Sequence, residues 1–411
     1  MNAPRSADAR AIVVRNDNWR IALDDAMRGI FAGRKTGPDL LLMFASSAYS
    51  DHFPEMVREA YFSSQAGCLV GCSARGVIAG EDSRESEPGI SLLALWLPGA
   101  VVTPVRLHQE NQDVLADPML WFDLHDLPPD EVEGWMVFAE PYRMDVQEAV
   151  KNLRSRYPRT PMIGALASTT RADRRMWIFI DDHVYDEGGV ALALQGPYHL
   201  DVIVSQGGEP VGESWTVTGV DKNRITTISN RPALEVLKET IATLGEAGGD
   251  DPPILIGFPM SEYQDEFKRG DFVVRGILGV DAEHGSLIVG SIPRVGQTVQ
   301  FHLRDPKTSS VDVQRLLGSV RDGVDEEALV AGLVCTCKGR GAAMFGSQDH
   351  DARAICDAFP GLPVAGMFSL GEIGPVRGVP ALNGFAMAFA VISEHSDDPN
   401  TQQSSLNDIP F

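Results

Sequence analysis

Three stretches of the chain share one pattern of hydrophobic and polar positions. Each begins with a short run that is apolar at every position, continues with an amphipathic segment and ends with a second apolar run. Such runs predict strands buried on both faces, and the strand–helix–strand order predicts a parallel pair. The three predicted units comprise residues 40–45, 51–61 and 68–72, then 135–139, 145–156 and 161–169, and finally 333–336, 349–359 and 362–369.

The three units also share small residues at the end of their second strand. Gly71, Gly164 and Gly366 occupy equivalent places, and just beyond them lie Ser73, Ser168 and Ser369. This agreement favours internal duplication of one β-α-β unit. The alternative is a chance similarity between generic α/β units, which are common.

Between these units the sequence consists of short apolar runs separated by turn residues. Runs at 177–180, 190–194 and 200–205, and again at 272–278, 286–289 and 298–303, have the spacing of antiparallel meanders. The predicted fold class is therefore α/β, with mixed sheets built from repeated β-α-β units plus antiparallel hairpins, in two tandem related halves.

Helices outside the units are predicted at two places. A mobile tail to about Val13 precedes a first helix over 22–31, which Gly33 closes. A helix over 232–244 opens the second half, with Asn230 as its N-cap and Pro232 in its first turn.

The third unit ends in the most distinctive stretch of the chain, residues 362–386. After an apolar run at 363–367 come Ser369, Gly371, Glu372 and Gly374, which predict a sharp bend with one carboxylate at its apex. A glycine-framed acid at a strand end has the composition of a small-molecule site. The alternative is a tight turn in which Glu372 only accepts backbone hydrogen bonds.

Composition and charge narrow the classes of partner. The 411 residues are 44% hydrophobic and 22% charged, as in an ordinary soluble protein. A net charge of −22 repels phosphate backbones and anionic lipid, so we expect neither nucleic acid nor membrane as a partner. The amino terminus has no apolar signal segment, and no run of about eighteen apolar residues occurs, so a cytoplasmic location is expected.

The five cysteines predict reduced thiols rather than a disulfide framework. Cys68 and Cys72 are four residues apart, and Cys335 and Cys337 are two apart. Neither spacing matches a tetrahedral zinc site, so no metal ligands are assigned.

A set of segments in order along the chain resembles the FIST family. The segments are GVALAL (189–194), SQGGEPVG (205–212), VT (217–218), NRPAL (230–234), RGILGVD (275–281), RVGQTVQF (294–301), CTCKGRG (335–341) and SLGEIGP (369–375). The resemblance extends from about Asp39 to Ile392. It implies a FIST N-terminal domain over 39–225 and a FIST C-terminal domain over 226–393. A tail with the first helix over 1–38 precedes them, and the polar carboxyl end over 394–411 is expected to be disordered.

The resemblance implies a sensory module that takes small ligands such as amino acids and feeds a signalling pathway. Some FIST proteins are described as binding haem and sensing nitric oxide, which gives an alternative function with haem as cofactor. The nine histidines are scattered and include no C-x-x-C-H attachment motif, so no histidine is assigned as a haem ligand. The sequence reveals no output domain, so the expected partner is a separate signalling protein such as a sensor kinase.

Arg340 is the natural counterpart of Glu372 in this site. It follows the third unit's first strand, and strands of a parallel unit end at one sheet edge, so it should lie beside Ser369 and Glu372. In one hypothesis Arg340 binds a ligand carboxylate and Glu372 binds an amino group. In the rival hypothesis the two side chains pair with one another and hold the loop shut. The other candidate ligand-binding residues are Gly371, Gly374, Cys335, Gly339 and Asn383, the last of which alternatively occupies a turn.

Equivalent positions in the other units are Ser73 and Arg75, and Ser168 and Thr169. These residues either line a second pocket or only cap helices. For Ser168 and Thr169 we favour the second interpretation, in which the hydroxyl groups bond nearby main chain. A thiol- or serine-dependent hydrolase is a further alternative, using a cysteine or Ser369 beside His350. The chain lacks G-x-S-x-G and G-x-x-x-x-G-K-[ST] motifs, so no catalytic residues are assigned and binding is favoured over catalysis.

Overall fold

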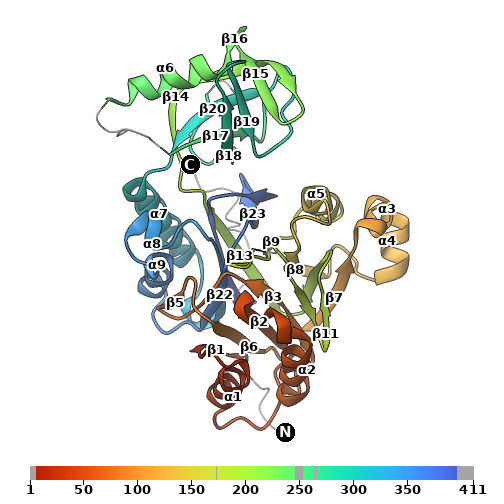
Figure 1. Ribbon diagram of the computed structural model, residues 1–411. Coiled ribbons are helices and arrows are strands. Elements are labelled where there is room, and N and C mark those ends of the chain that lie inside the picture. Colours follow the sequence, from red (N-terminus) through yellow and green to blue (C-terminus); the bar gives the residue numbers. More distant parts are fainter. Residues whose placement is uncertain (1–5, 173, 246–252, 263, 265, 396–411) are drawn as a thin grey trace. The chain divides into compact units, whose positions relative to one another are not determined.

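A computed structural model describes residues 6–172, 174–245, 253–262, 264 and 266–395 (Figure 1). The described chain forms two compact units, and the boundary between them does not follow one cut in the sequence. The first unit comprises residues 6–204, 314–382 and 386–395, and the second comprises 205–313 and 383–385. Within these described ranges, no helix combines the length and apolar character needed to cross a bilayer.

The first unit contains three six-stranded mixed sheets. The first sheet has the order β1-β6-β2-β3-β10-β11, with β1 Asp8–Arg15, β2 Leu40–Ser46, β3 Cys68–Ala74, β6 Gly89–Trp96, β10 Ile178–Ile180 and β11 His183–Tyr185. The second has the order β24-β23-β9-β8-β12-β7, with β7 Val101–Leu107, β8 Val132–Ala139, β9 Met162–Leu166, β12 Gly189–Gln195, β23 Glu372–Val376 and β24 Val379–Asn383. The third has the order β13-β25-β21-β22-β4-β5, with β4 Gly76–Ala79, β5 Asp82–Arg84, β13 Tyr198–Ser205, β21 Leu329–Cys337, β22 Val364–Ser369 and β25 Met387–Glu394.

Of the helices beside these sheets, those at 19–30, 53–64, 146–156 and 350–358 lie close to predicted positions, and the other four were not predicted. These helices are α1 Trp19–Ile30, α2 Phe53–Ser64 after a 3-10 turn Ser47–His52, α3 Gln112–Ala116, α4 Pro118–His125, α5 Val146–Arg156, α7 Pro306–Gly323, α8 Ala342–Phe345 and α9 His350–Ala358, with short 3-10 turns at Gln109–Asn111 and Glu326–Ala328. Helices α1 and α2 cover the outer face of the first sheet, and α3, α4 and α5 cover that of the second (Figure 1).

All three predicted β-α-β units are present, one in each sheet. β2 and β3, β8 and β9, and β21 and β22 are parallel neighbours joined through α2, α5 and α9. The predicted fold class, mixed α/β with repeated β-α-β units, is confirmed.

The glycines at equivalent positions of the three β-α-β units have the same steric cause. A Cβ atom added to Gly71 would lie 1.7 Å from the carbonyl oxygen of Met43 on the neighbouring strand. The corresponding distances are 1.9 Å from Gly164 to Val137 O and 1.7 Å from Gly366 to Val334 O. Any side chain at these positions would push the paired strands apart, so glycine is required for the close approach.

Each β-α-β unit is also followed by a hairpin that joins the sheet of another β-α-β unit. After β3, the hairpin β4–β5 pairs with β22; after β9, β10–β11 pairs with β3; after β22, β23–β24 joins β9. The predicted antiparallel meander at 177–205 is therefore wrong, because β10, β12 and β13 belong to three different sheets. Local alternation identifies these strands but cannot identify their partners.

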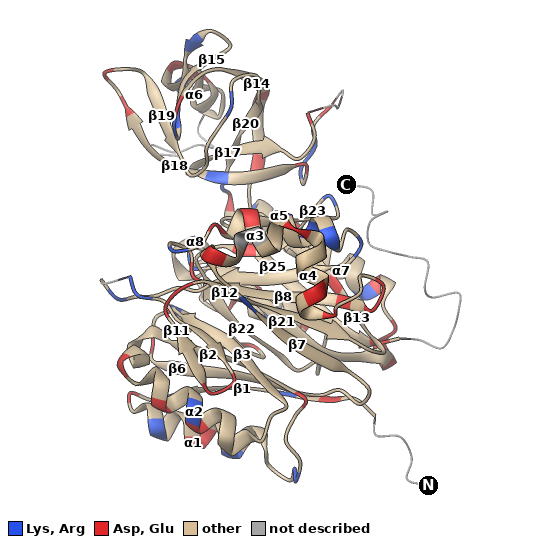
Figure 2. Ribbon diagram, turned by 90° about the vertical axis from the view of Figure 1, so that its right-hand side faces the viewer, with Lys and Arg blue, Asp and Glu red and all other residues tan. Residues whose placement is uncertain are grey.

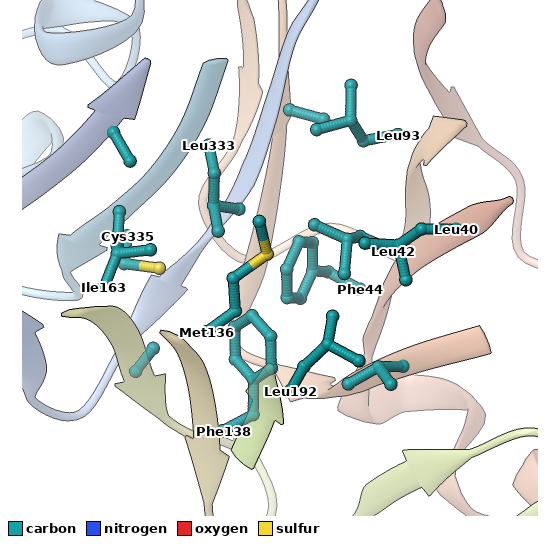
Figure 3. Packing of buried hydrophobic residues seen from close by; sticks show 14 of the residues in the cluster. Leu40, Leu42, Phe44, Leu93, Met136, Phe138, Ile163, Leu192, Leu333 and Cys335 are labelled. Carbon is teal, nitrogen blue, oxygen red and sulfur yellow. The ribbon is translucent and has the colours of Figure 1, made fainter. Parts of the chain in front are cut away.

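One apolar core joins the inner faces of the three sheets. Phe44 of the first sheet and Phe138 of the second meet edge to face, with ring centroids 5.3 Å apart. Leu333 and Cys335 of the third sheet point into the same cluster (Figure 3). Alternate residues of the same strands pack under the outer helices, which explains why the runs are apolar at every position. Figure 2 accordingly shows charged positions mainly on helices and loops.

The second unit is a closed antiparallel ring accompanied by α6 Ala233–Thr243 and by residues 306–313 of α7. The ring runs β14-β20-β17-β18-β19-β15 and closes through pairing of β15 with β14, and β16 extends it. Its strands are β14 Glu209–Asp221, β15 Arg224–Ile228, β16 Arg231–Pro232, β17 Ile254–Pro259, β18 Phe272–Asp281, β19 Ser286–Val289 and β20 Thr298–Leu303. The predicted run of three consecutive strands is only partly correct, because β18 pairs with β19 whereas β20 pairs with β14 and β17.

Three predictions about the ends of elements are wrong. The tail predicted to be mobile to Val13 is strand β1, which pairs along its length with β6. Helix α1 begins at Trp19 and not at the predicted residue 22, because the Asn18 side chain caps it by accepting from the Arg20 N–H. Helix α6 has Pro232 at its N-cap position rather than Asn230. Of the predicted disordered tail over 394–411, Glu394 is the last residue of β25, and 396–411 lie outside the described residues.

Candidate functional site

The candidate site of the third unit lies where β21 and β22 end side by side. Cys337 and Ser369 are paired in register, and the Lys338 N–H donates to the Ser369 carbonyl at 2.9 Å. Beyond β21 the chain turns through Gly339 and Arg340 into the short helix α8. The two segments that carry the predicted residues therefore leave one edge of the sheet together, as expected for a parallel pair.

Arg340 is 1% exposed and forms a bidentate ion pair with Asp351 of α9. Its Nε donates to Oδ2 at 2.8 Å and its Nη2 donates to Oδ1 at 3.0 Å. Asp351 Oδ2 also accepts from Thr336 Oγ1 at 2.6 Å, and Oδ1 lies 2.9 Å from Nδ1 of His350. Burial alone would raise the pKa of Asp351, but Arg340 and the hydrogen bonds with His350 and Thr336 hold it well below its usual range.

One donor of the buried guanidinium remains unused. Among the described residues, Arg340 Nη1 is buried and has no hydrogen-bond partner. The Arg340 Cζ lies 5.2 Å from the centroid of the Phe345 ring, and that ring stacks on His350 with centroids 3.6 Å apart. An unsatisfied buried N–H costs about 1–3 kcal/mol, so it marks a place where a hydrogen-bond acceptor would be favourable.

Glu372 is fully buried and is held by groups on either side of it. Its Oε1 lies 2.5 Å from Ser369 Oγ, and its Oε2 accepts from the Ala386 N–H at 3.1 Å. Burial lowers the pKa of Arg340, but Asp351 and, to a smaller extent, Cys337 and Glu372 raise it above the ordinary value. Glu372 is thus near enough to act on the guanidinium electrostatically, whereas the bidentate partner of Arg340 is Asp351.

The predicted bend with Glu372 at its apex is wrong. Glu372 is the first residue of the extended strand β23, which pairs with β9 of the second sheet. The chain changes sheets over Leu370 and Gly371, where the Leu166 N–H donates to the Gly371 carbonyl at 2.8 Å. Gly374 lies in the same strand, and a Cβ there would come within 2.5 Å of the Val204 side chain. Gly374 therefore allows close packing between strands, and Gly371 belongs to the bend over which the chain changes sheets.

The remaining predicted residues have separate surroundings. Cys335 is buried in the apolar core, and burial raises the pKa of its thiol well above the ordinary value, as it does for Cys72. Thiols with such raised pKa values are poor nucleophiles at neutral pH. Asn383 belongs to the second compact unit of the fold, where its amide oxygen accepts from Gln206 Nε2 at 3.0 Å. Gly339 lies in the turn beside Arg340.

The strand ends of all three units meet at Ser168. Its N–H donates to the Ser73 carbonyl at 3.1 Å, and its Oγ lies 2.5 Å from the Phe368 carbonyl. The same Oγ accepts from the Arg75 N–H at 2.7 Å. Ser168 therefore bonds main chain of the two other units and not nearby main chain, contrary to the expectation. Thr169 behaves as predicted, because its Oγ1 accepts from the N–H of Arg171 two residues on.

Sequence reasoning missed Asp351 and Thr336, which complete the polar cluster around Arg340. Asp351 lies four residues before the buried Ile355, on the face of α9 that is otherwise apolar. A carboxylate within an apolar stripe signals a buried cation, and the Gly-framed Arg340 of the same unit was the nearest candidate. Thr336 gave no such signal, because threonine is common in strands.

Comparison with known proteins places the chain in a family. A family model described as the FIST N domain matches residues 39–231, and one described as the FIST C domain matches 233–375. The chain therefore belongs to the FIST family, as the resemblance indicated, and consists of a FIST N domain followed by a FIST C domain. FIST domains are associated with sensory signal transduction. The domain limits at 225 and 393 remain predictions.

Relatives of similar length occur in mycobacteria. The uncharacterized protein Rv0628c of Mycobacterium tuberculosis is 32% identical over 375 residues, which cover 86% of this chain and 91% of that protein. The uncharacterized protein Mb0898c of Mycobacterium bovis is 31% identical over 373 residues, covering 86% and 90%. Among solved structures, cyanuric acid hydrolase from A. caulinodans aligns over 95% of this chain and 100% of its own, with 7% identity and a TM-score of 0.34. That TM-score reflects only a general likeness.

Proposed function

We propose that this FIST protein is a sensory module that binds a small ligand at Arg340 and Glu372 and passes the signal to a separate protein, such as a sensor kinase. The ligand class is a molecule with a carboxylate and an amino group, of which amino acids are the simplest. The observation that supports this proposal is the buried Nη1 of Arg340, which has no hydrogen-bond partner among the described residues. A ligand carboxylate would satisfy it with a charge-assisted hydrogen bond.

Charge balance supports a ligand that carries both groups. Asp351 already neutralises Arg340 through two hydrogen bonds, and Glu372 is a second buried carboxylate near the guanidinium. A ligand that brought only a negative charge would leave the buried cluster with excess negative charge, which is costly in a low dielectric. An amino group placed toward Glu372 offsets that charge.

Ligand entry requires local opening, because both side chains are buried. The segment best suited to move is α8, which has only four residues and is bounded by Gly341 and by Gly346, the latter with a positive φ of 71°. Displacement of α8 would lift Phe345 from the guanidinium and from His350. We propose that this movement is the signal, because it exposes an aromatic side chain to a partner.

Thermal unfolding of the full chain without an affinity tag tests the proposal. The proteinogenic amino acids, simple carboxylic acids and simple amines are added separately, and the shift in Tm is recorded. A ligand at about a hundred times its Kd stabilises the folded state by about 2.7 kcal/mol, a measurable shift. We expect an amino acid to shift Tm more than an acid or an amine that carries only one of its two groups.

Two matched variants locate the binding. Arg340→Lys keeps a positive charge beside Asp351 but removes the planar fork and Nη1, so we expect ligand affinity to fall by about tenfold or more. Arg156→Lys changes another buried arginine, whose Nη1 donates to the Asn152 carbonyl, and should retain the full response. Equal responses from both variants would mean that the ligand binds elsewhere. The absence of any shift across the three compound classes would refute this ligand class.

A further inference from the structure

Three metal-ligating side chains meet on the surface of the first unit, away from Arg340. Glu133, His199 and His395 each offer one ligand atom, and these atoms all lie within 4.8 Å of one another. The three residues come from widely separated parts of the sequence, so no spacing motif marks them.

The fold positions each residue by a different local feature. Glu133 lies at a β-bulge of β8, because Gly134 pairs with Leu194 and Val132 pairs with Gln195, which leaves Glu133 as the extra residue. Bulges redirect side chains and are frequent beside functional sites. His199 is the second residue of β13, and His395 follows the end of β25, its neighbour in the third sheet.

Backbone contacts fix the last of these positions. The N–H of His395 donates to the carbonyl of Pro197 at 2.9 Å, which holds the chain beside β13 after β25 has ended. The two imidazole centroids are consequently 6.4 Å apart. Both rings face carboxylates, with His199 Nε2 lying 3.5 Å from Asp201 Oδ1 and His395 Nε2 lying 3.6 Å from Glu133 Oε2.

We propose that Glu133, His199 and His395 form a binding site for a divalent first-row transition-metal ion such as Zn²⁺, with Asp201 as a fourth ligand or as a hydrogen-bond partner of His199. Two imidazoles with one or two carboxylates are a typical ligand set for such ions, and open positions are filled by water. This inference is independent of the proposed ligand site at Arg340.

The geometry is that of an ion-free site that needs a small contraction. Metal–nitrogen and metal–oxygen bonds of about 2.0–2.2 Å place tetrahedral ligand atoms about 3.3–3.6 Å apart. The side chains of His199, His395 and Glu133 are 46%, 36% and 30% exposed, so they can rotate into those positions and an ion can enter from solvent. The net charge of −22 also favours cation approach.

Other histidine–carboxylate pairs on the described chain contain one histidine each. His183 Nδ1 lies 2.8 Å from Asp182 Oδ1, and His284 Nδ1 lies 3.1 Å from Asp281 Oδ2. Those pairs are explained as surface ion pairs. In the proposed site the ligand atoms of two histidines from distant segments lie within 4.8 Å of each other and of a Glu133 carboxylate oxygen, which provides the additional ligand that metal binding requires.

A bound ion would join elements of two sheets. Glu133 belongs to β8 of the second sheet, whereas His199 belongs to β13 of the third and His395 fixes the chain after β25. The ion would therefore cross-link these segments, and its binding free energy would add to the stability of the folded first unit.

Zn²⁺ titration of the full chain without a histidine tag, by isothermal calorimetry after treatment with a chelator, tests this site. We expect one ion per chain and a rise in Tm on addition of Zn²⁺. The double variant His199→Gln/His395→Gln should lose affinity by about a hundredfold or more, since two imidazole ligands are removed. The control double variant His183→Gln/His284→Gln should bind as the wild type does.

Cobalt substitution gives an independent readout of the ligands. Co²⁺ bound at this site should give visible absorption bands of nitrogen and oxygen coordination, and Glu133→Gln should change their intensity while the circular dichroism stays the same. Absence of stoichiometric binding in the wild type would overturn the proposal. Equal Zn²⁺ affinity in the two double variants would overturn it as well.

Discussion

Arg340 and Asp351 form a buried ion pair joined by two hydrogen bonds, and neither side chain has appreciable contact with solvent. Removing one partner of such a pair leaves an uncompensated charge in a low dielectric, which typically costs about 3–5 kcal/mol. We therefore expect Arg340→Ala to lower the free energy of unfolding by about that amount, measured by urea denaturation followed by circular dichroism.

The double variant Arg340→Met/Asp351→Leu tests whether the cost arises from the unpaired charge. It should lose less stability than either single variant, because no charge is left alone. Arg353→Ala is the control, since the exposed Arg353 lies 3.7 Å from Asp349 and should change the free energy of unfolding by no more than about 0.5 kcal/mol. Additive losses in the double variant would show that the pair is not coupled.

The repeated glycines give a second prediction. Gly164→Ala places a methyl group 1.9 Å from the carbonyl oxygen of Val137, so the parallel strands β8 and β9 must separate. We expect a loss of about 3 kcal/mol or more in the free energy of unfolding, comparable to overpacking of a core, measured by urea denaturation.

Gly318→Ala is the matched control for this substitution. Gly318 lies within α7, and a Cβ there meets no atom within 4 Å. Alanine should stabilise the helix by about 0.5–1 kcal/mol. If Gly164→Ala were as stable as the wild type, the steric account of the three equivalent glycines would be wrong.

His302 should make the stability of the second compact unit, residues 205–313 and 383–385, sensitive to acid. It is buried against Phe272, with ring centroids 5.0 Å apart, and burial lowers its pKa to about 4. The unfolded chain, with an ordinary histidine pKa near 6.5, binds more protons between about pH 6.5 and 4. Stability is therefore present above about pH 6.5 and is lost as the pH falls toward 4, by on the order of 3 kcal/mol.

Urea denaturation at a series of pH values measures this dependence. His302→Leu should have a smaller slope of unfolding free energy against pH between about 6.5 and 4 than the wild type. An unchanged slope in His302→Leu would mean that the buried histidine does not govern the acid response.

The two ends of the described chain lie side by side, which predicts that a circular permutant will fold. The N–H of Ala7 donates to Glu394 Oε1 at 3.2 Å, so β1 begins where β25 ends. We expect a chain that joins these ends through a short Gly/Ser linker, and that opens at the exposed turn of Arg377 and Gly378, to keep the wild-type circular dichroism and cooperative unfolding.

A permutant opened between Leu41 and Leu42 is the negative control. Both residues are fully buried within β2, and new charged termini there should prevent folding. If the permutant opened at Arg377 and Gly378 also failed to fold, although it was expressed at full length, the prediction that the two ends can be joined would be wrong.

The sequence by itself determined the strands and helices of the three β-α-β units of this protein. Continuous apolar runs on either side of an amphipathic helix predicted the three β-α-β units, because burial on both faces leaves a signal in every residue of a strand. Gly71, Gly164 and Gly366 were identified for the same reason, since each responds to its immediate neighbour strand. The order of FIST segments then indicated the family.

The tertiary structure alone decided which distant residues meet. Nothing local to Glu372 specifies that its strand joins β9, or that β10 leaves the second unit of the repeat to pair with β3, because strand edges are chemically alike and partner choice depends on the packing of the whole core. The partnership of Arg340 with Asp351 and the meeting of Glu133, His199 and His395 have the same origin: each is fixed by where separate chain segments are packed, and a sequence pattern records only what each segment buries.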